Sequence, residues 1–329
     1  MSNISASANA EANMLKVESP SLIFNPELTI NSTNGDVPNS RKTFPERFIE
    51  GLSRAIQPVK FEKKLSEARW EYTKSICECV KLYKKTMPSL TDNQAYLFAN
   101  GYMLTPAEAN NVASVFGEAE KQVSQNADPD DLSIEFRDSF IKGAATAYDD
   151  EVRTLWTSLL AEETETPGFF SKQTMSSLSN MNAQDAKTFK TLCAYSLTGI
   201  NIQPYGGAIV PVLKEEKDGS WFYNNGNIEI KSLKTLSSLG LIDTSIWEVF
   251  TAAPESETLF KTEKYSLIVK NASESEIRYN FSNALFLDAG LQLGTLCQNG
   301  TAKDLQELVE EILNFKGLKC SWNRIIKIT

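Results

Sequence analysis

The chain has 329 residues, of which 33 are Lys or Arg and 42 are Asp or Glu, so its formal net charge is -9 at pH 7. An acidic balance of this size argues against a protein that coats nucleic acid with a uniformly basic surface. Histidine is absent, which excludes Ser-His-Asp and Cys-His triads, histidine general bases and histidine zinc ligands.

The first predicted segment is a polar arm at residues 1–43. Serine and asparagine are abundant there, with seven of each in the first forty residues. A segment of this composition buries too little apolar surface to fold alone, so we expect a disordered or loosely docked arm. The rest of the chain is long enough for two domains, which we expect at residues 44–198 and 199–329.

A long basic amphipathic helix is predicted after Pro58. Between residues 41 and 85 there are 12 Lys and Arg against 6 Asp and Glu, and apolar residues recur at near-helical spacing. The basic face would suit an anionic partner such as nucleic acid, phospholipid or an acidic protein. The alternative is a solvated face, or one neutralised by residues 86–170, which hold 15 acidic and 4 basic residues. The candidate surface consists of Lys60, Lys63, Lys64, Arg69, Lys74, Lys81, Lys84 and Lys85.

Two helix starts are predicted in the acidic region. Thr105-Pro106-Ala107-Glu108 has the pattern of a capping box with proline at the first helical position, and Asp128-Pro129 is expected to open the next helix. Acidic residues gather at positions 128–131 and 149–151. We interpret both clusters as helix caps, because they lack the glycine and the terminal glutamate of a calcium loop. No metal site is therefore predicted.

The clearest periodicity lies between Asp149 and Leu197. The spacing i, i+3, i+4, i+7, i+8 predicts a helix with one apolar stripe, formed by Val152, Leu155, Trp156, Leu159 and Leu160. Pro167-Gly168 ends this helix, and Ser171 and Asn182 are expected to cap two shorter ones. Three helices joined by tight turns follow from this pattern.

The same stretch contains a longer motif, formed by Glu151, Leu155, Trp156, Leu159, Leu160, Ala161, Pro167, Gly168, Phe170, Ser171, Leu178, Asp185, Ala186 and Phe189. With these residues the stretch resembles an uncharacterised bacterial family related to the abortive-infection alpha (Abi-alpha) proteins. The resemblance implies a bacterial or prophage origin and a role against phage, but it implies no reaction and no catalytic residue. The alternative is that the apolar members are simply the core of a helical domain. The expected structural core of the motif comprises Leu155, Trp156, Leu159, Leu160, Pro167, Gly168, Phe170, Asp185, Ala186 and Phe189.

After Leu197 the pattern becomes mixed. Strands are expected at Ala208–Leu213, Ser220–Tyr223, Ile246–Phe250, Lys264–Lys270, Glu276–Phe281 and Cys320–Ile328. Helices are expected at Lys231–Leu239, from Asn283 onward, and across Leu305, Leu308 and Ile312. The order of helix, glycine turn, hairpin and helix resembles a winged helix. The expected fold class is therefore α+β, with a mainly α-helical N-terminal body followed by a winged-helix-like α/β C-terminal domain.

The cysteines and the apolar runs indicate a cytoplasmic protein. The five cysteines are Cys77, Cys79, Cys193, Cys297 and Cys320, and their odd number and irregular spacing favour reduced thiols over a disulfide framework or a zinc site. Residues 1–20 lack the basic start and the apolar core of a secretory signal. The longest uncharged run, Thr191–Leu213, contains prolines and glycines, so we interpret it as a helix end and a strand rather than a membrane span.

Motifs for catalysis were not found. The sequence has no P-loop, no dinucleotide-binding glycine fingerprint and no G-x-S-x-G, so no catalytic residue and no cofactor are predicted. The favoured hypothesis is a non-catalytic interaction or effector protein in anti-phage defence, which self-associates or binds a protein partner through its opposite charge blocks.

Two alternatives involve the basic regions. The chain could be a nucleic-acid-binding regulator that uses the winged helix and the basic helix at residues 41–85. Its candidate recognition helix, Ile228–Leu239, offers only Lys231 and Lys234, whereas DNA readers usually present several basic residues. Membrane association through the basic helix is the third and least favoured hypothesis.

Overall fold

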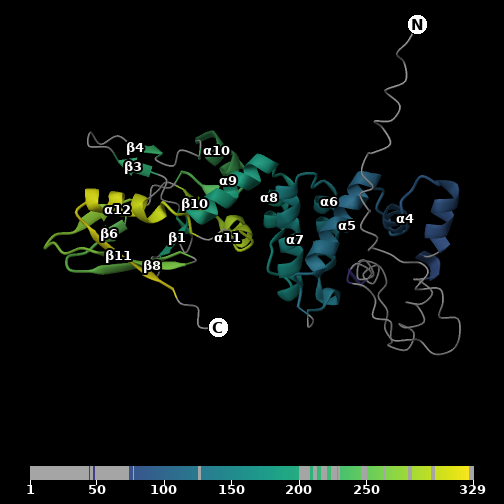
Figure 1. The fold of residues 1–329 in the computed structure, drawn as a ribbon, viewed down its shortest axis with the longest axis horizontal. Helices are drawn as coiled ribbons and strands as arrows, with labels where there is room; N and C mark the ends of the chain where they lie inside the picture. Colours follow the sequence, from purple (N-terminus) through teal and green to yellow (C-terminus); the bar gives the residue numbers. More distant parts are fainter. Residues whose placement is uncertain are drawn as a thin grey trace, which may run out of the picture. The chain divides into compact units, whose positions relative to one another are not determined.

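The fold is α+β, as predicted. In the computed structural model, helices form most of the described chain up to Ala194, and the strands follow it (Figure 1). The structure describes residues 44, 47–48, 74–76, 78–124, 127–199, 208–209, 213–215, 221–223, 228, 230–245, 250–262, 264–280, 284–297 and 301–325. The predicted arm at residues 1–43 lies outside this set. Within this set, no helix combines the length and the apolar character that a bilayer crossing requires.

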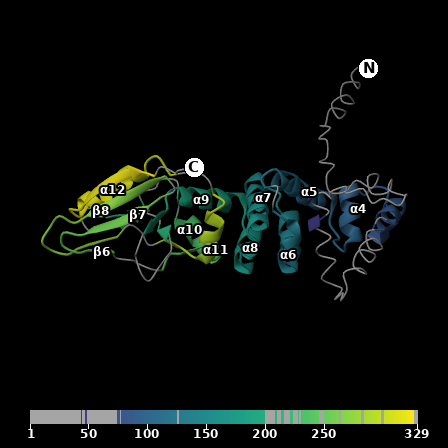
Figure 2. The same cartoon turned by 90° about the horizontal axis from the view of Figure 1, so that it is seen from below.

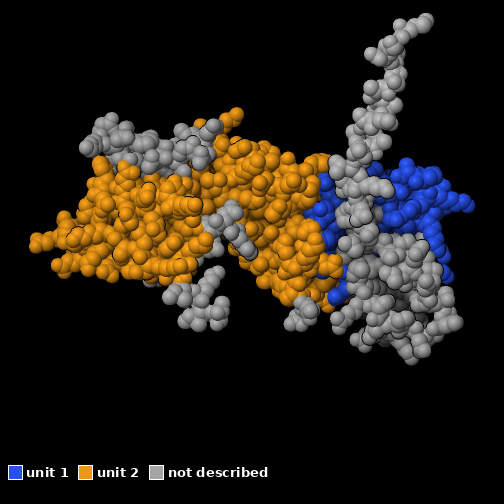
Figure 3. Space-filling model, viewed as in Figure 1, with its two compact units in different colours: residues 1–117 blue, residues 118–329 orange. Residues whose placement is uncertain are grey.

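The chain divides into two compact units, residues 1–117 and 118–329 (Figure 3). Helix α4 (Asp92–Ala99) belongs to the first unit, and most of helix α5 (Pro106–Glu120) belongs to it as well. The predicted capping box before α5 is present, since the Thr105 N–H donates to Glu108 Oε2 at 2.8 Å and the Glu108 N–H donates to Thr105 Oγ1 at 3.3 Å. Phe48 and Phe116 are fully buried and meet edge to face, with ring centroids 4.9 Å apart.

The helical half of the second unit consists of the short 3-10 helix η1 (Pro129–Asp131) and of α6 (Ile134–Ala145), α7 (Asp150–Glu165), α8 (Lys172–Ser179) and α9 (Ala183–Ala194). Asp128-Pro129 opens η1 rather than the long helix predicted there. The buried Arg137 accounts for the difference, because its Nε donates to the Leu132 carbonyl at 2.9 Å. The chain is extended at Leu132, and Ser133 then caps α6.

The three helices of the Asp149–Leu197 stretch begin and end close to the predicted positions. Ser171 Oγ accepts a hydrogen bond from the Thr174 N–H at 3.1 Å and so caps α8. Asn182 forms a full capping box with Asp185 at the start of α9. Helix α7 approaches α6 closely at Gly143, where an added Cβ would lie 2.2 Å from Trp156 Cζ2. Only glycine fits at that position.

The C-terminal half contains a seven-stranded sheet and two ribbons. The order in the sheet is β11-β8-β7-β1-β2-β10-β5, and all its neighbouring strands are antiparallel. Its strands are β1 (Leu197–Gly199), β2 (Ala208–Ile209), β5 (Ile242–Asp243), β7 (Glu257–Lys261), β8 (Tyr265–Lys270), β10 (Leu285–Phe286) and β11 (Lys319–Arg324). The ribbons pair β3 (Leu213–Glu215) with β4 (Trp221–Tyr223), and β6 (Phe250–Ala252) with β9 (Ile277–Tyr279).

Three helices accompany these strands: α10 (Ile230–Ser238), α11 (Asp288–Gly294) and α12 (Leu305–Phe315). Figure 2 shows α12 along one face of the sheet that contains β7 and β8. The prediction of a helix from Asn283 onward was wrong, because Leu285 and Phe286 form strand β10, which pairs with both β2 and β5. The helix begins only at Asp288. Strand β7 was not predicted. Phe260 is its only buried residue, so its sequence shows no alternation of apolar and polar residues.

Candidate functional site

The family-like motif lies in the packing between α7, α8 and α9. Most of its predicted core is buried: Leu155, Trp156, Leu159, Leu160, Phe170, Asp185, Ala186 and Phe189. Pro167 and Gly168 are instead exposed, and they form the turn between α7 and α8. Gly168 has a φ of +86°, in the left-handed region that favours glycine. The motif thus combines a packed helical core with one tight turn.

A buried carboxylate holds that turn from inside. Glu163 of α7 is 2% exposed, and its two oxygens accept hydrogen bonds from the Gly168 N–H at 2.7 Å and from the Phe170 N–H at 2.9 Å. Burial raises the pKa of Glu163, and the backbone hydrogen bonds of the turn oppose that shift. Because the carboxylate accepts from two backbone donors of the turn, and the Phe170 N–H would otherwise be buried without a partner, Glu163 fixes the path from α7 to α8.

Helix α8 is fastened to the C-terminal half by polar contacts at both of its ends. At its start, Gln292 Oε1 of α11 accepts hydrogen bonds from the Ser171 N–H at 3.0 Å and from the Thr174 hydroxyl. Further along, the Ser177 hydroxyl donates to the Leu239 carbonyl at 2.6 Å. These bonds link residues more than sixty positions apart, so they join the motif to the strands and helices that follow it.

Helix α11 also approaches the strand β5 region at van der Waals distance. A Cβ added to Gly290 would lie 2.0 Å from the Leu241 carbonyl oxygen. The same carbonyl accepts a hydrogen bond from the Leu287 N–H at 3.0 Å. Gly290 therefore lets the first turn of α11 rest directly on the backbone before β5.

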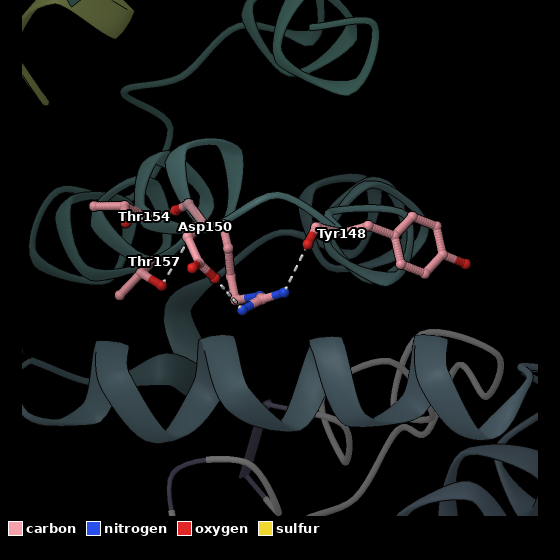
Figure 4. A network of polar contacts seen from close by, with 5 residues as sticks. Tyr148, Asp150, Thr154 and Thr157 are labelled. Carbon is pink, nitrogen blue, oxygen red and sulfur yellow. Dashed lines mark hydrogen bonds and ion pairs between the residues drawn. The ribbon is translucent and has the colours of Figure 1, made fainter. Parts of the chain in front are cut away.

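The contacts of α8 and α11 described above, together with the packing of α7 and α9, form a junction between the helical motif and the C-terminal half. Charged residues at the start of α7 add to this junction. Lys190 of α9 lies 2.5 Å from Glu151, and its hydrogen bond and positive charge lower the pKa of that carboxyl. In the neighbouring network, Arg153 Nη1 lies 2.7 Å from Asp150 Oδ1 and its Nη2 donates to the Tyr148 carbonyl at 3.1 Å. Figure 4 shows Asp150 and Tyr148 in this network. Both contacts hold the N-terminal turn of α7, where acidic residues also suit the helix dipole.

The predicted anionic-partner surface falls only partly on described residues. Lys60, Lys63, Lys64 and Arg69 lie outside them. Lys74, Lys81, Lys84 and Lys85 are all exposed. Of these four, Lys84 forms an ion pair with Asp92 of α4. Asp92 belongs to the acidic region 86–170, so the Lys84 pair is one contact in which this region neutralises a lysine of the basic face.

Two cysteine thiols meet in the interior of the second unit. Cys193 lies at the end of α9, and an added Cβ at Gly294 would be 3.8 Å from its Sγ. A hydrogen bond with Cys297 and burial raise the pKa of Cys193 well above the ordinary thiol value. Cys79, Cys193, Cys297 and Cys320 are all free thiols. Cys297 is buried and Cys193 is partly buried. A thiol with a raised pKa is a weak nucleophile, so Cys193 is not activated for chemistry.

The arrangement as a whole fixes helices rather than presenting reactive groups together. Glu163, Gln292 and Asp185 each bind the backbone or a hydroxyl of a neighbouring turn. Among the described residues, no three His, Cys, Asp or Glu side chains gather as metal ligands. Chemically, the junction can hold α7, α8, α9 and α11 in one rigid arrangement.

Residues 103–310 match the model of a family described as a protein of unknown function, DUF2806, and the chain belongs to this family. The match covers the motif, the junction with α11 and most of α12. Neither the curated proteins nor the solved structures contain a match to the chain.

Sequence reasoning missed the residues that hold the junction. Glu163 follows Leu159 by four positions, so it continues the apolar stripe of α7 five residues before Gly168. A glutamate on an apolar stripe just before a Pro-Gly turn is the sequence signal that could have indicated its role. Gln292 and Gly290 gave no comparable local signal, because their partners lie far away in the sequence.

Proposed function

We propose that this chain is a non-catalytic interaction protein that acts in bacterial defence against phage, in the manner of an abortive-infection effector in the cytoplasm. The observation that supports the non-catalytic role most directly is the use of the motif's buried polar groups. Glu163 accepts hydrogen bonds from two backbone N–H groups of its own turn, so its oxygens are occupied by structure. The defence role rests on the resemblance of Glu151–Phe189 to an uncharacterised family related to the Abi-alpha proteins.

In this proposal the protein self-associates or binds a protein partner. Its residues 41–85 and 86–170 carry opposite charge, with 12 basic against 6 acidic residues in the first block and 15 acidic against 4 basic in the second. Segregated charges favour contact between copies or with a partner of complementary charge, and they steer association.

Plating efficiency of a broad phage panel tests the defence role. Cells that express the chain at a native-like level should support fewer plaques of at least some phages than cells with an empty vector. Escaper phages that recover plating would then identify the trigger. Equal plating of every phage on both strains would refute the role in defence.

A nucleic-acid-binding regulator with a winged-helix-like C-terminal part is the second candidate. The exposure of Lys74, Lys81 and Lys85 favours it. Helix α10 adds only two exposed lysines, Lys231 and Lys234. Binding through these lysines would neutralise phosphates, so the affinity for duplex DNA should fall steeply as salt rises. An affinity that is the same at low and moderate salt would refute this second candidate.

A further inference from the structure

Strand β11 is an edge of the seven-stranded sheet. Among the described strands its one neighbour is β8, with Trp322 opposite Leu267 and Arg324 opposite Tyr265. Beyond the strand, the Ile325 N–H donates to the Lys264 carbonyl at 2.8 Å. Hydrogen-bonded positions alternate along an antiparallel ladder. The backbone groups of odd-numbered residues therefore point toward β8, and those of even-numbered residues point toward the open edge.

The open edge carries the N–H and C=O groups of Cys320, Trp322 and Arg324, and no described strand pairs with them. A row of unpaired backbone groups is a template for another strand. The centre of β11, Cys320–Asn323, contains neither a charge nor a proline to block pairing. Lys319 and Arg324 flank that centre. This edge therefore suits addition of a strand whose charges complement those flanks.

The α12 face of the sheet supplies an opposite charge next to this edge. Helix α12 packs against β11, and Glu310 of α12 is close enough to Cys320 for its charge to contribute to the raised pKa of that thiol. Residues two apart in a strand point to the same face, so Arg324 lies on the same face as Cys320. Among the described residues, neither Glu310 nor Arg324 forms an ion pair, and both are exposed.

We propose that β11 forms a homodimer interface, in which it pairs antiparallel with β11 of a second copy about a two-fold axis at Trp322. In this register Trp322 faces Trp322 of the second copy, and Arg324 faces Cys320 of the second copy. Arg324 then lies beside Glu310 of the second copy, and symmetry repeats the ion pair. The inference rests on the self-association proposed above and names the surface that mediates it.

The charge pattern selects this register from its neighbours. A shift of the two-fold axis to Ser321 would place Cys320 opposite Trp322 of the second copy, and Arg324 would leave the vicinity of Glu310. Both registers keep side chains of the two copies on matching faces, so the position of the charges distinguishes them. The self-complementary positions of Arg324 and Glu310 are the reason why the partner is a second copy.

Two substitutions at one position separate the backbone contribution from the charge. Arg324→Ala removes both ion pairs and should weaken dimerisation about 2- to 30-fold, since exposed pairs are individually weak. Arg324→Pro also removes an N–H that points to the open edge, while the ladder with β8 keeps its bonds. This variant should be a monomer at concentrations where Arg324→Ala still dimerises. Arg324→Glu should weaken the dimer further, and Arg324→Glu combined with Glu310→Lys should restore it.

Mass by light scattering across a dilution series is the readout, with circular dichroism as the check that each variant is folded. A wild-type dimer whose mass is unchanged by Arg324→Pro and Arg324→Glu would overturn the β11 interface and leave self-association intact. A wild-type monomer at every concentration would refute both. Neither result decides whether the wild-type chain restricts phage, so the failure of the β11 interface and the failure of the defence role are distinguishable.

Cross-linking tests the register. In a Cys320→Ser background, Trp322→Cys should give a disulfide-linked dimer on oxidation, because the paired Cα atoms would be about 5.5 Å apart, within disulfide range. The matched control is Ser321→Cys, which would face Asn323 of the second copy and should stay monomeric in denaturant. A Ser321→Cys dimer without a Trp322→Cys dimer would overturn the register.

Discussion

Replacing the buried carboxylate of Glu163 with its neutral amide should measurably destabilise the second unit. In Glu163→Gln, one oxygen becomes an NH2 group, so it can accept a hydrogen bond from only one of the Gly168 and Phe170 N–H groups. A buried donor left without an acceptor costs about 1–3 kcal/mol. For a unit of this size each kcal/mol lowers Tm by about 2–4 °C, so a fall of about 2–12 °C is expected.

The assay is thermal unfolding followed by circular dichroism, with Glu162→Gln as the matched control. Glu162 is the exposed neighbour of Glu163 on the same helix, so its neutralisation should leave Tm nearly unchanged. Glu163→Ala should lower Tm more than Glu163→Gln, because it removes both acceptors and leaves a cavity. A Glu163→Gln protein that unfolds at the same temperature as Glu162→Gln would refute the role assigned to this carboxylate.

Four further outcomes are expected. Gly143→Ala should cost about 1–3 kcal/mol, because its Cβ would lie 2.2 Å from Trp156, whereas Gly117→Ala in an open helical position should be neutral or stabilising in denaturant titrations. Lys190→Met should cost at most about 1 kcal/mol, because it breaks a partly exposed ion pair with Glu151. If Lys190→Met lost the same stability at low and at high salt, a Coulombic origin would be contradicted. Burial raises the pKa of Glu163, so ionisation of this carboxyl disfavours the folded state. The stability advantage of wild type over Glu163→Gln should therefore shrink as pH rises through that pKa. An advantage that grows with pH would contradict the raised pKa. Cys193 should react with a thiol reagent much more slowly in the native protein than in urea, and equal rates would show that the thiol is accessible.

The local signals of the sequence predicted the helices well. Caps act within a few residues, and for that reason Ser171 and Asn182 marked the starts of α8 and α9 correctly. The error at Asp128-Pro129 came from Arg137, whose side chain reaches back to the Leu132 carbonyl. A cap motif cannot report such a tertiary contact, because the motif contains only backbone and neighbouring side-chain information.

The strands and the junction could not be predicted in the same way. Leu285-Phe286 reads as the start of a helix, and only its pairing with β2 and β5 makes it a strand. The order β11-β8-β7-β1-β2-β10-β5 joins segments from distant parts of the chain, so no local pattern encodes it. Gln292 likewise acquires its role only because Ser171, 121 residues away, lies beside it.

Plating efficiency with structure-guided variants tests the central claim most directly. The claim is that the chain protects bacteria against phage through protein contacts rather than catalysis. Cells that express wild type at a native-like level should restrict some phages of a broad panel. Arg324→Pro should lose that restriction, and Arg324→Glu with Glu310→Lys should keep it. Full plating of every phage on cells that contain the wild-type protein, verified by immunoblot, would contradict the account.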